Sequence, residues 1–203
     1  MSVGGTAAYR DLTNLPPLVR RAVDTAAAAG FDNSCRPEQG RLLAALAQGA
    51  SRIGETGTGC GVGLAWLVSG AAPTAELVSV ERDLGRAALA TDLFADASRV
   101  TVITGDWTQI AHYAPFDLLV LDGGGGGKGA DDEPAPVELL RPGGTIVIDD
   151  LTPAAHWPPR FGGRVDEARM YWLRHPELDT AELRLAPDFA ALVATRRHPG
   201  QDG

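Results

Sequence analysis

Acidic residues stand at the ends of two apolar segments of the sequence. Asp122 ends the segment 116–122, and Asp149 and Asp150 follow one another at the end of the segment 145–149. Near-continuous apolar segments of this length are typical of strands buried on both faces of a parallel sheet. If the two strands are neighbours, about 4.8 Å apart, the three carboxylates converge and repel. A hard cation with oxygen ligands, Mg²⁺ or Ca²⁺, would relieve that repulsion.

Two basic side chains near these carboxylates are candidate proton acceptors. Lys128 follows five consecutive glycines, 123–127, and we expect residues 123–129 to be flexible without a ligand. Lys128 could therefore swing toward the carboxylates, or it could stay solvated as a loop charge. His156 follows the second acidic pair and is the competing base, because histidine titrates near neutral pH. It could equally be a surface-loop histidine, so the identity of the base stays open.

A glycine-rich turn is the second chemical feature. A short segment ends at Glu55, and Gly57, Gly59, Gly61 and Gly63 follow before an apolar helical pattern. Glycines allow a sharp turn and the close approach of a ligand, and the helix start behind them offers free N–H groups. The dinucleotide fingerprint needs glycine or alanine at its sixth position, but the three possible registers place valine, leucine or tryptophan there. A nicotinamide-dependent oxidoreductase is therefore disfavoured.

The Glu-x-Gly-x-Gly-x-Gly pattern of residues 55–63 resembles the first motif of the class I S-adenosylmethionine-dependent methyltransferases. The resemblance covers roughly residues 37–195. It implies a ribose-binding acid at the end of the next strand, an adenine-binding segment after the third strand, and an acid near the sulfonium after the fourth. The implied cofactor-binding residues are Glu55, Gly57, Gly59, Gly61, Gly63, Glu81, Arg82, Gly105, Asp106, Trp107 and Asp122.

Within that class, the acidic residues resemble the metal site of the catechol and caffeoyl-CoA type O-methyltransferases. Those enzymes combine an Asp after strand four with an Asp-Asn pair after strand five. This sequence has Asp150 in place of the Asn, and Gly125 where the family carries its catalytic Lys. Metal-free relatives also carry Asp-Asp, so a metal requirement stays open. The resemblance implies catalytic roles for Asp122 and for either Lys128 or His156.

The intervening sequence alternates between strand and helix patterns. The predicted helices cover residues 17–29, 37 onward, 64 onward, 83–96, 134–141 and 163–174, and the predicted strands cover 52–55, 76–81, 99–104, 116–122, 145–149, 181–185 and 189–195. The last two strands are joined by only three residues, which requires an antiparallel pair. We therefore predict an α/β, doubly wound, Rossmann-like sheet of seven mostly parallel strands with an antiparallel C-terminal hairpin and helices on both faces.

Length and composition set further limits. A chain of 203 residues predicts a single domain, 1–203, with an N-terminal arm and helix over 1–36 and a core over 37–195. We expect residues 1–15 to be flexible or loosely docked. The net charge of −8 argues against nucleic acid as a partner. No apolar run approaches the length of a membrane span, and two cysteines without a secretory pattern favour the cytoplasm.

These features together predict an S-adenosylmethionine-dependent methyltransferase that modifies an oxygen of a small-molecule acceptor, with possible assistance from Mg²⁺ or Ca²⁺. The alternatives are a metal-independent methyltransferase on another acceptor, including RNA, an NAD-dependent oxidoreductase, and a cofactor-binding module without catalysis. Relatives of the resembled family are often homodimers, which by analogy leaves a homodimer open here.

Overall fold

The computed structural model describes residues 4–122, 128 and 135–200. The predicted flexibility of the glycine run therefore falls outside the described residues, apart from Lys128 itself. The helices are α1 Pro17–Ala28, α2 Pro37–Ala47, α3 Val62–Gly70, α4 Leu84–Leu93 and α5 Glu167–Arg174, with 3₁₀ turns η1 Ala7–Tyr9, η2 Trp107–Tyr113 and η3 Pro136–Leu139. The strands are β1 Arg52–Thr56, β2 Glu76–Glu81, β3 Val100–Thr104, β4 Phe116–Leu121, β5 Leu140–Leu151, β6 Arg160–Phe161, β7 Arg164–Val165, β8 Leu178–Ala186 and β9 Phe189–Arg196.

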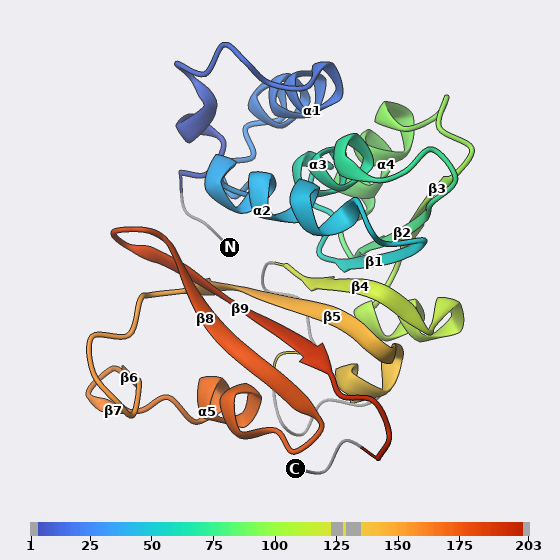
Figure 1. Ribbon diagram of the computed structural model, residues 1–203. Coiled ribbons are helices and arrows are strands. Elements are labelled where there is room, and N and C mark those ends of the chain that lie inside the picture. The colour runs from blue at the N-terminus through green and yellow to red at the C-terminus, as the bar shows by residue number, and fades with distance from the viewer. Residues whose placement is uncertain (1–3, 123–127, 129–134, 201–203) are drawn as a thin grey trace.

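Seven strands form one twisted sheet in the order β3-β2-β1-β4-β5-β9-β8 (Figure 1). The first five are parallel to one another, and β9 runs antiparallel between β5 and β8. This arrangement confirms the predicted doubly wound sheet with an antiparallel C-terminal hairpin. It also confirms that β4 and β5 are neighbours, with Leu121 paired to Ile148, so Asp122 and Asp149 follow at adjacent strand ends.

Alternate residues of the central strands face opposite sides of the sheet and build two cores. On one side, Ile53, Leu118 and Val120 pack against α1, α2, α3 and α4. On the other, Leu119 and Ile148 pack with the buried Trp172 of α5 and with residues of η2 and η3. Figure 1 shows α1–α4 gathered on one side of the sheet and α5 on the other. The alternation follows from the two-residue repeat of a strand, and burial on both faces explains the apolar sequences.

The predictions for residues 134–141 and 145–149 need correction. The helix is shorter, a single 3₁₀ turn, and β5 begins at Leu140 instead of residue 145. The Pro142-Gly143-Gly144 sequence does not end the strand, because it forms an irregularity at which the register against β4 shifts between Phe116 and Leu118. Gly143 has φ +78°, a conformation that glycine adopts without strain.

A second correction concerns the predicted helix 163–174. Its first residues instead belong to a two-stranded hairpin, β6 and β7, whose turn contains Gly162 and Gly163 with positive φ values. Helix α5 begins after Asp166, whose carboxylate accepts a hydrogen bond from the Arg169 amide. An aspartate at this position satisfies one of the free N–H groups of a helix start.

The N-terminal arm is docked, contrary to the expectation of a loose segment. Tyr9 is buried, its hydroxyl donates to the Cys35 carbonyl at 2.7 Å, and it accepts from Trp66 Nε1 at 2.9 Å. Thr6 Oγ1 lies 2.6 Å from the Phe31 carbonyl and 2.7 Å from Ser34 Oγ. These buried hydrogen bonds hold the loop between α1 and α2, which lines the site described next. Within residues 4–122, 128 and 135–200, no helix is long and apolar enough to cross a membrane.

Candidate active site

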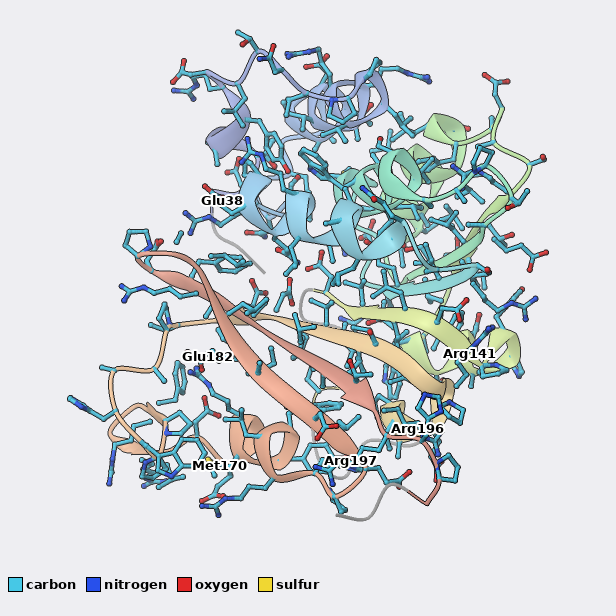
Figure 2. The ribbon with its side chains drawn as sticks, viewed as in Figure 1. Glu38, Arg141, Met170, Glu182, Arg196 and Arg197 are labelled. Carbon is cyan, nitrogen blue, oxygen red and sulfur yellow. The ribbon has the colours of Figure 1, made fainter. Side chains whose placement is uncertain are left out.

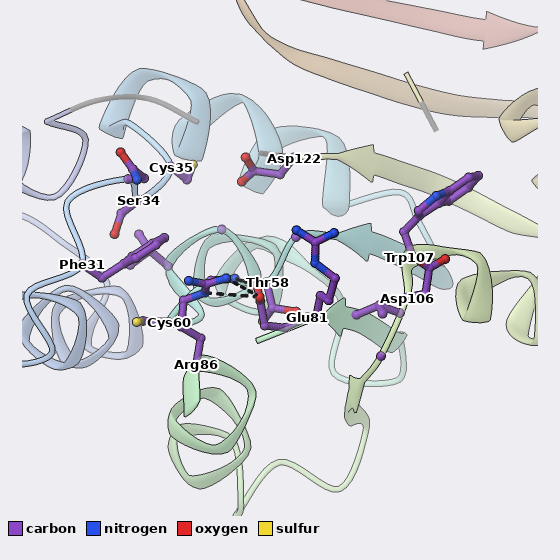
Figure 3. A pocket seen from close by; sticks show the side chains of 18 residues that line it. Phe31, Ser34, Cys35, Thr58, Cys60, Glu81, Arg86, Asp106, Trp107 and Asp122 are labelled. Carbon is purple, nitrogen blue, oxygen red and sulfur yellow. Dashed lines mark hydrogen bonds and ion pairs between the residues drawn. The ribbon is translucent and has the colours of Figure 1, made fainter. Parts of the chain in front are cut away.

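A pocket opens at the carboxyl ends of β1, β2 and β3, where ligands bind in sheets of this topology (Figure 3). Most of the predicted cofactor-binding residues line it: Gly57, Gly59, Gly63, Glu81, Arg82, Gly105, Asp106, Trp107 and Asp122. Glu55 and Gly61 are not among the lining residues in the described part of the chain. The structure therefore brings together segments that are far apart in the sequence.

The glycine turn leads directly from β1 into α3. Gly59 has φ +56° and donates its N–H to Glu81 Oε2 at 2.8 Å. Gly61, at the start of α3, has φ +91°, and a Cβ there would come within 3.0 Å of the Phe94 ring. Gly61 is thus required for the turn and for packing against α4, which differs from the direct cofactor contact that the resemblance implied.

Glu81 is a buried acceptor at the end of β2. Its Oε2 accepts the Gly59 amide, and its Oε1 accepts the Asp83 amide at 2.8 Å and Arg86 Nη2 at 2.8 Å. Figure 3 shows the pairing of Glu81 with Arg86. Carboxylates form stronger hydrogen bonds than neutral acceptors do, so Glu81 is suited to bind a diol.

Glu55 lies beneath the glycine turn and is almost fully buried. A Cβ on Gly63 would come within 2.5 Å of Glu55 Oε1, so only glycine fits above this carboxyl group. Ser79 Oγ donates to Glu55 Oε2. Burial raises the pKa of Glu55 to about 8 despite the hydrogen bond from Ser79. Its position fits support of the glycine turn and does not place it at the pocket surface.

Replacing Glu55 with glutamine is expected to flatten the pH dependence of stability. Below the unfolded-state pKa of about 4.3, the contribution of Glu55 to stability is fully present, and it is lost as the pH rises through the folded-state pKa of about 8. The stability of Glu55→Gln relative to wild type should therefore rise by up to about 1.4 kcal/mol per pH unit across this window. Urea titrations at several pH values measure it, with the exposed Glu76→Gln as control. A difference that does not change with pH would contradict the assignment.

The segment after β3 forms the opposite wall of the pocket. The Asp106 carboxylate accepts hydrogen bonds from the Thr108 amide at 3.1 Å and hydroxyl at 2.8 Å, and these bonds lower its pKa. Trp107 is half-buried beside it, and Arg82 is exposed at the rim. A flat aromatic ligand could therefore contact Trp107 while an amino group approaches Asp106.

Several lining residues were missed by the sequence reasoning. They are Phe31, Asn33, Ser34 and Cys35 between α1 and α2, Thr58, Cys60 and Val62 in the glycine turn, and Val80 and Arg86. Figure 3 shows Phe31, Ser34 and Cys35 across the pocket from Asp106 and Trp107. Arg86 could have been found from its position in the first turn of α4, five residues after Glu81. The loop before α2 carries no comparable signal, because only the docked arm brings it to the pocket.

The three predicted acidic residues meet beside the pocket, at its lining residue Asp122. Asp122, Asp149 and Asp150 each present a carboxylate oxygen, and these oxygens lie within 4.8 Å of one another. Burial and the neighbouring Asp149 raise the pKa of Asp122 well above its usual range. Burial acts in the same direction on Asp149, but Lys128 and the hydrogen bonds from Asp122, Lys128 and Gln39 hold the pKa of Asp149 below its usual range. The pKa values of the two neighbouring carboxyl groups are thus shifted in opposite directions.

Lys128 reaches this cluster. Its Nζ lies 2.6 Å from Asp149 Oδ1, and the other oxygen of Asp149 accepts from Gln39 Nε2 at 2.9 Å. Lys128 is the single lysine of the whole sequence. Of the two candidate bases, Lys128 is therefore placed at the carboxylates, whereas His156 is exposed in the loop after β5 and is not among the described residues that line the pocket. Sequence reasoning did not find Gln39, whose buried position on α2 is set by helix packing.

The donor set of the cluster fits a divalent cation. All three groups offer oxygen atoms, which are the ligands that Mg²⁺ and Ca²⁺ prefer, and burial together with the neighbouring Asp149 raises the pKa of Asp122. The same charges are also partly balanced by Lys128 at Asp149. The residues therefore fit a metal ion and fit a metal-free arrangement built on the ion pair.

Residues 55–151 match the family model described as a methyltransferase domain. These residues, slightly less than half of the chain, are similar to that family. The matched residues run from the carboxylate under the glycine turn to the acidic cluster, so the match includes both parts of the site. This result confirms the resemblance to S-adenosylmethionine-dependent methyltransferases that the glycine motif implied.

The proteins that are similar to this chain include proteins named as O-methyltransferases. The chain is 34% identical over 161 residues to a protein of Mycobacterium sp. (strain JLS) that is provisionally named an O-methyltransferase; the match covers 73% of this chain and 65% of the relative. The chain thus spans slightly less than two thirds of that relative's length. Its structure resembles the O-methyltransferase from Bacillus cereus in complex with SAH, with TM-score 0.74, 23% identity and coverage of 95% and 96%. It also resembles cofactor-bound Rv0187 from MTB, with TM-score 0.73, 24% identity and coverage of 98% and 99%.

Proposed function

We propose that this protein is a methyltransferase that transfers a methyl group from S-adenosylmethionine to an oxygen atom of a small molecule. The observation that carries the proposal is the position of Asp122, which lines the pocket and also belongs to the acidic cluster. A cofactor bound over the glycine turn would therefore end where the carboxylates and Lys128 begin. The transfer needs this juxtaposition, because methyl donor and acceptor must be aligned for an in-line displacement.

In this proposal, different pocket residues contact different parts of the cofactor. Glu81 would accept hydrogen bonds from the ribose hydroxyls, for which its oxygens are already oriented by the Gly59 and Asp83 amides. Asp106 and Trp107 would receive the adenine. The glycine turn would pass under the amino acid tail, and Asp122 would lie near the sulfonium. When bound, the cofactor supplies an electrophilic methyl group.

Beside the pocket, Lys128 would take the proton of the acceptor hydroxyl as a neutral amine, after the ammonium of the Lys128–Asp149 ion pair has released a proton to solvent. The contact with Asp149 holds its amine at the cluster, and Gln39 holds the other oxygen of Asp149. General-base assistance of this kind typically contributes about 10²–10⁴-fold to the rate. The proton released from the acceptor hydroxyl would pass to Lys128, and the acceptor oxygen would be left as the nucleophile for the methyl group that the bound cofactor supplies.

We also propose that a divalent cation at the acidic cluster assists the transfer. Asp122, Asp149 and Asp150 would hold it, and it would supply a Lewis acid that lowers the pKa of the acceptor hydroxyl. The Lys128–Asp149 ion pair supports the metal-independent form of the same reaction. We also propose a cytoplasmic location and a homodimer. The net charge of −8 favours a small acceptor over a nucleic acid.

The proposal is tested by incubating the protein with S-adenosylmethionine labelled in its methyl group and a panel of catechols and other small hydroxyl compounds. We expect label in the acceptor, and the reaction repeated after EDTA treatment tests the metal. Loss of transfer that Mg²⁺ restores would support the metal-assisted form, and unchanged transfer would support the metal-independent form. Label transferred to RNA but to none of the small molecules would contradict the proposal.

A further inference from the structure

The backbone of Lys128 is held by a residue far away in the sequence. The indole Nε1 of Trp172 donates a hydrogen bond to the Lys128 carbonyl oxygen at 3.0 Å. Trp172 lies on α5, on the side of the sheet opposite α1–α4, and is 1% exposed. A buried indole N–H requires a partner, and here the partner is the residue whose side chain reaches the acidic cluster.

Helix α5 is itself firmly placed. The Trp172 carbonyl accepts from Thr180 Oγ1 of β8 at 2.8 Å. Arg169, also buried, pairs with Asp166 at 3.1 Å and with Glu182 of β8 at 3.0 Å. Figure 2 shows Met170 on α5 and Glu182 on the neighbouring strand. The indole of Trp172 is therefore a fixed point relative to the sheet.

Helix α5 is also linked to the loop that follows the acidic pair. Glu182, which accepts from Arg169, uses its second oxygen to accept the Ala154 amide at 2.8 Å. Ala154 belongs to the loop that follows Asp149 and Asp150. Helix α5 thus contacts Lys128 directly and, through Glu182, the segment after the acidic pair.

We propose that Trp172 is a positioning residue that fixes the Lys128 backbone so that the Lys128 amine stays at Asp149 during methyl transfer. The consequence for methyl transfer rests on the proposed function, whereas the placement of Lys128 by Trp172 does not. The Trp172 indole holds the Lys128 carbonyl oxygen, and this bond fixes the point from which the long side chain reaches Asp149. Trp172 touches neither the pocket nor the carboxylates and would act through Lys128 alone.

The test replaces Trp172 with phenylalanine, which keeps an aromatic ring and removes the N–H donor. Because Lys128 is the single lysine, mass spectrometry after brief acetylation with acetic anhydride reports its accessibility directly, with the α-amino group as internal reference. We expect about tenfold faster acetylation of Lys128 in Trp172→Phe. The control is Met170→Leu, which changes a buried neighbour on α5 at nearly constant volume and leaves the indole donor, and its acetylation rate should match wild type.

Activity supplies the second arm. Trp172→Phe should lower kcat by about 10- to 100-fold, since small misplacements of reacting groups have effects of that size, with the Kd for S-adenosylhomocysteine unchanged. In a Lys128→Met background, Trp172→Phe should have no further effect on kcat. If Trp172→Phe does not fold, Trp172→Met, which is also large and apolar and has no N–H or O–H donor, is measured in its place. An unchanged acetylation rate, or equal effects of the substitution in both backgrounds, would overturn the inference; an inactive wild-type protein would instead contradict the proposed function and leave the acetylation result valid.

Discussion

Lys128→Met is expected to lower kcat by about 10²–10⁴-fold, the range of general-base catalysis, while the Kd for S-adenosylhomocysteine changes little. The reason is that Lys128 Nζ lies 2.6 Å from Asp149 at the acidic cluster, whereas most of the proposed cofactor contacts lie at the ends of β1, β2 and β3. Steady-state rates with a labelled methyl donor and calorimetric binding measure the two quantities on the same protein. Circular dichroism checks the fold, because the buried Asp149 loses its ion-pair partner.

Lys128→Arg separates the two roles that Lys128 could have. Arginine keeps the positive charge beside Asp149, but it is not deprotonated in proteins. If Lys128 is the base, Lys128→Arg should be nearly as inactive as Lys128→Met. Full activity in Lys128→Arg would show that Lys128 is only a counter-ion, and full activity in both variants would remove Lys128 from the catalytic site.

Glu81→Ala is expected to weaken S-adenosylhomocysteine binding by about 1.5–3 kcal/mol, or roughly 10- to 150-fold, the usual range for hydrogen bonds to a charged group. Glu81 is buried at the end of β2 and offers carboxylate oxygens to the pocket. Removing it also leaves the Gly59 amide and Arg86 without their acceptor, which should disorder the glycine turn and reinforce the loss.

The matched control lies on the same strand. Glu76 begins β2 at the opposite edge of the sheet, is exposed, and pairs with Arg52 at 2.7 Å. Glu76→Ala should leave the Kd unchanged. Equal affinities of wild type and Glu81→Ala, measured by isothermal titration calorimetry, would exclude Glu81 from the cofactor site.

The sheet could be predicted because short stretches of consecutive residues specify its strands and their connections. The apolar runs of β2 and β4 leave little freedom in where the strands end, and the three-residue link between β8 and β9 permits only an antiparallel pair. Glu81, Asp122 and Asp149 could then be placed at one edge of the sheet, since that follows from the topology. The glycine turn was readable for the same reason: its spacing is a property of consecutive residues.

The missed features depend on tertiary contacts. The arm is docked through Tyr9, whose partners Cys35 and Trp66 are 26 and 57 residues away, and nothing in the local pattern indicates this. The position of Lys128 depends on Trp172, 44 residues further on. The continuation of β5 through Pro142 and Gly143 was missed because local rules interpret that sequence as a break, whereas pairing with β4 and β9 stabilises an irregular strand.

The central claim, that the pocket over the glycine turn binds S-adenosylmethionine, is tested most directly by calorimetric titration of the wild-type protein with S-adenosylhomocysteine and, separately, with NAD. The account predicts saturable binding of S-adenosylhomocysteine at one site per chain, with a negative heat-capacity change from burial of the adenine, and no saturable heat with NAD. Saturable binding of NAD without binding of S-adenosylhomocysteine would contradict it.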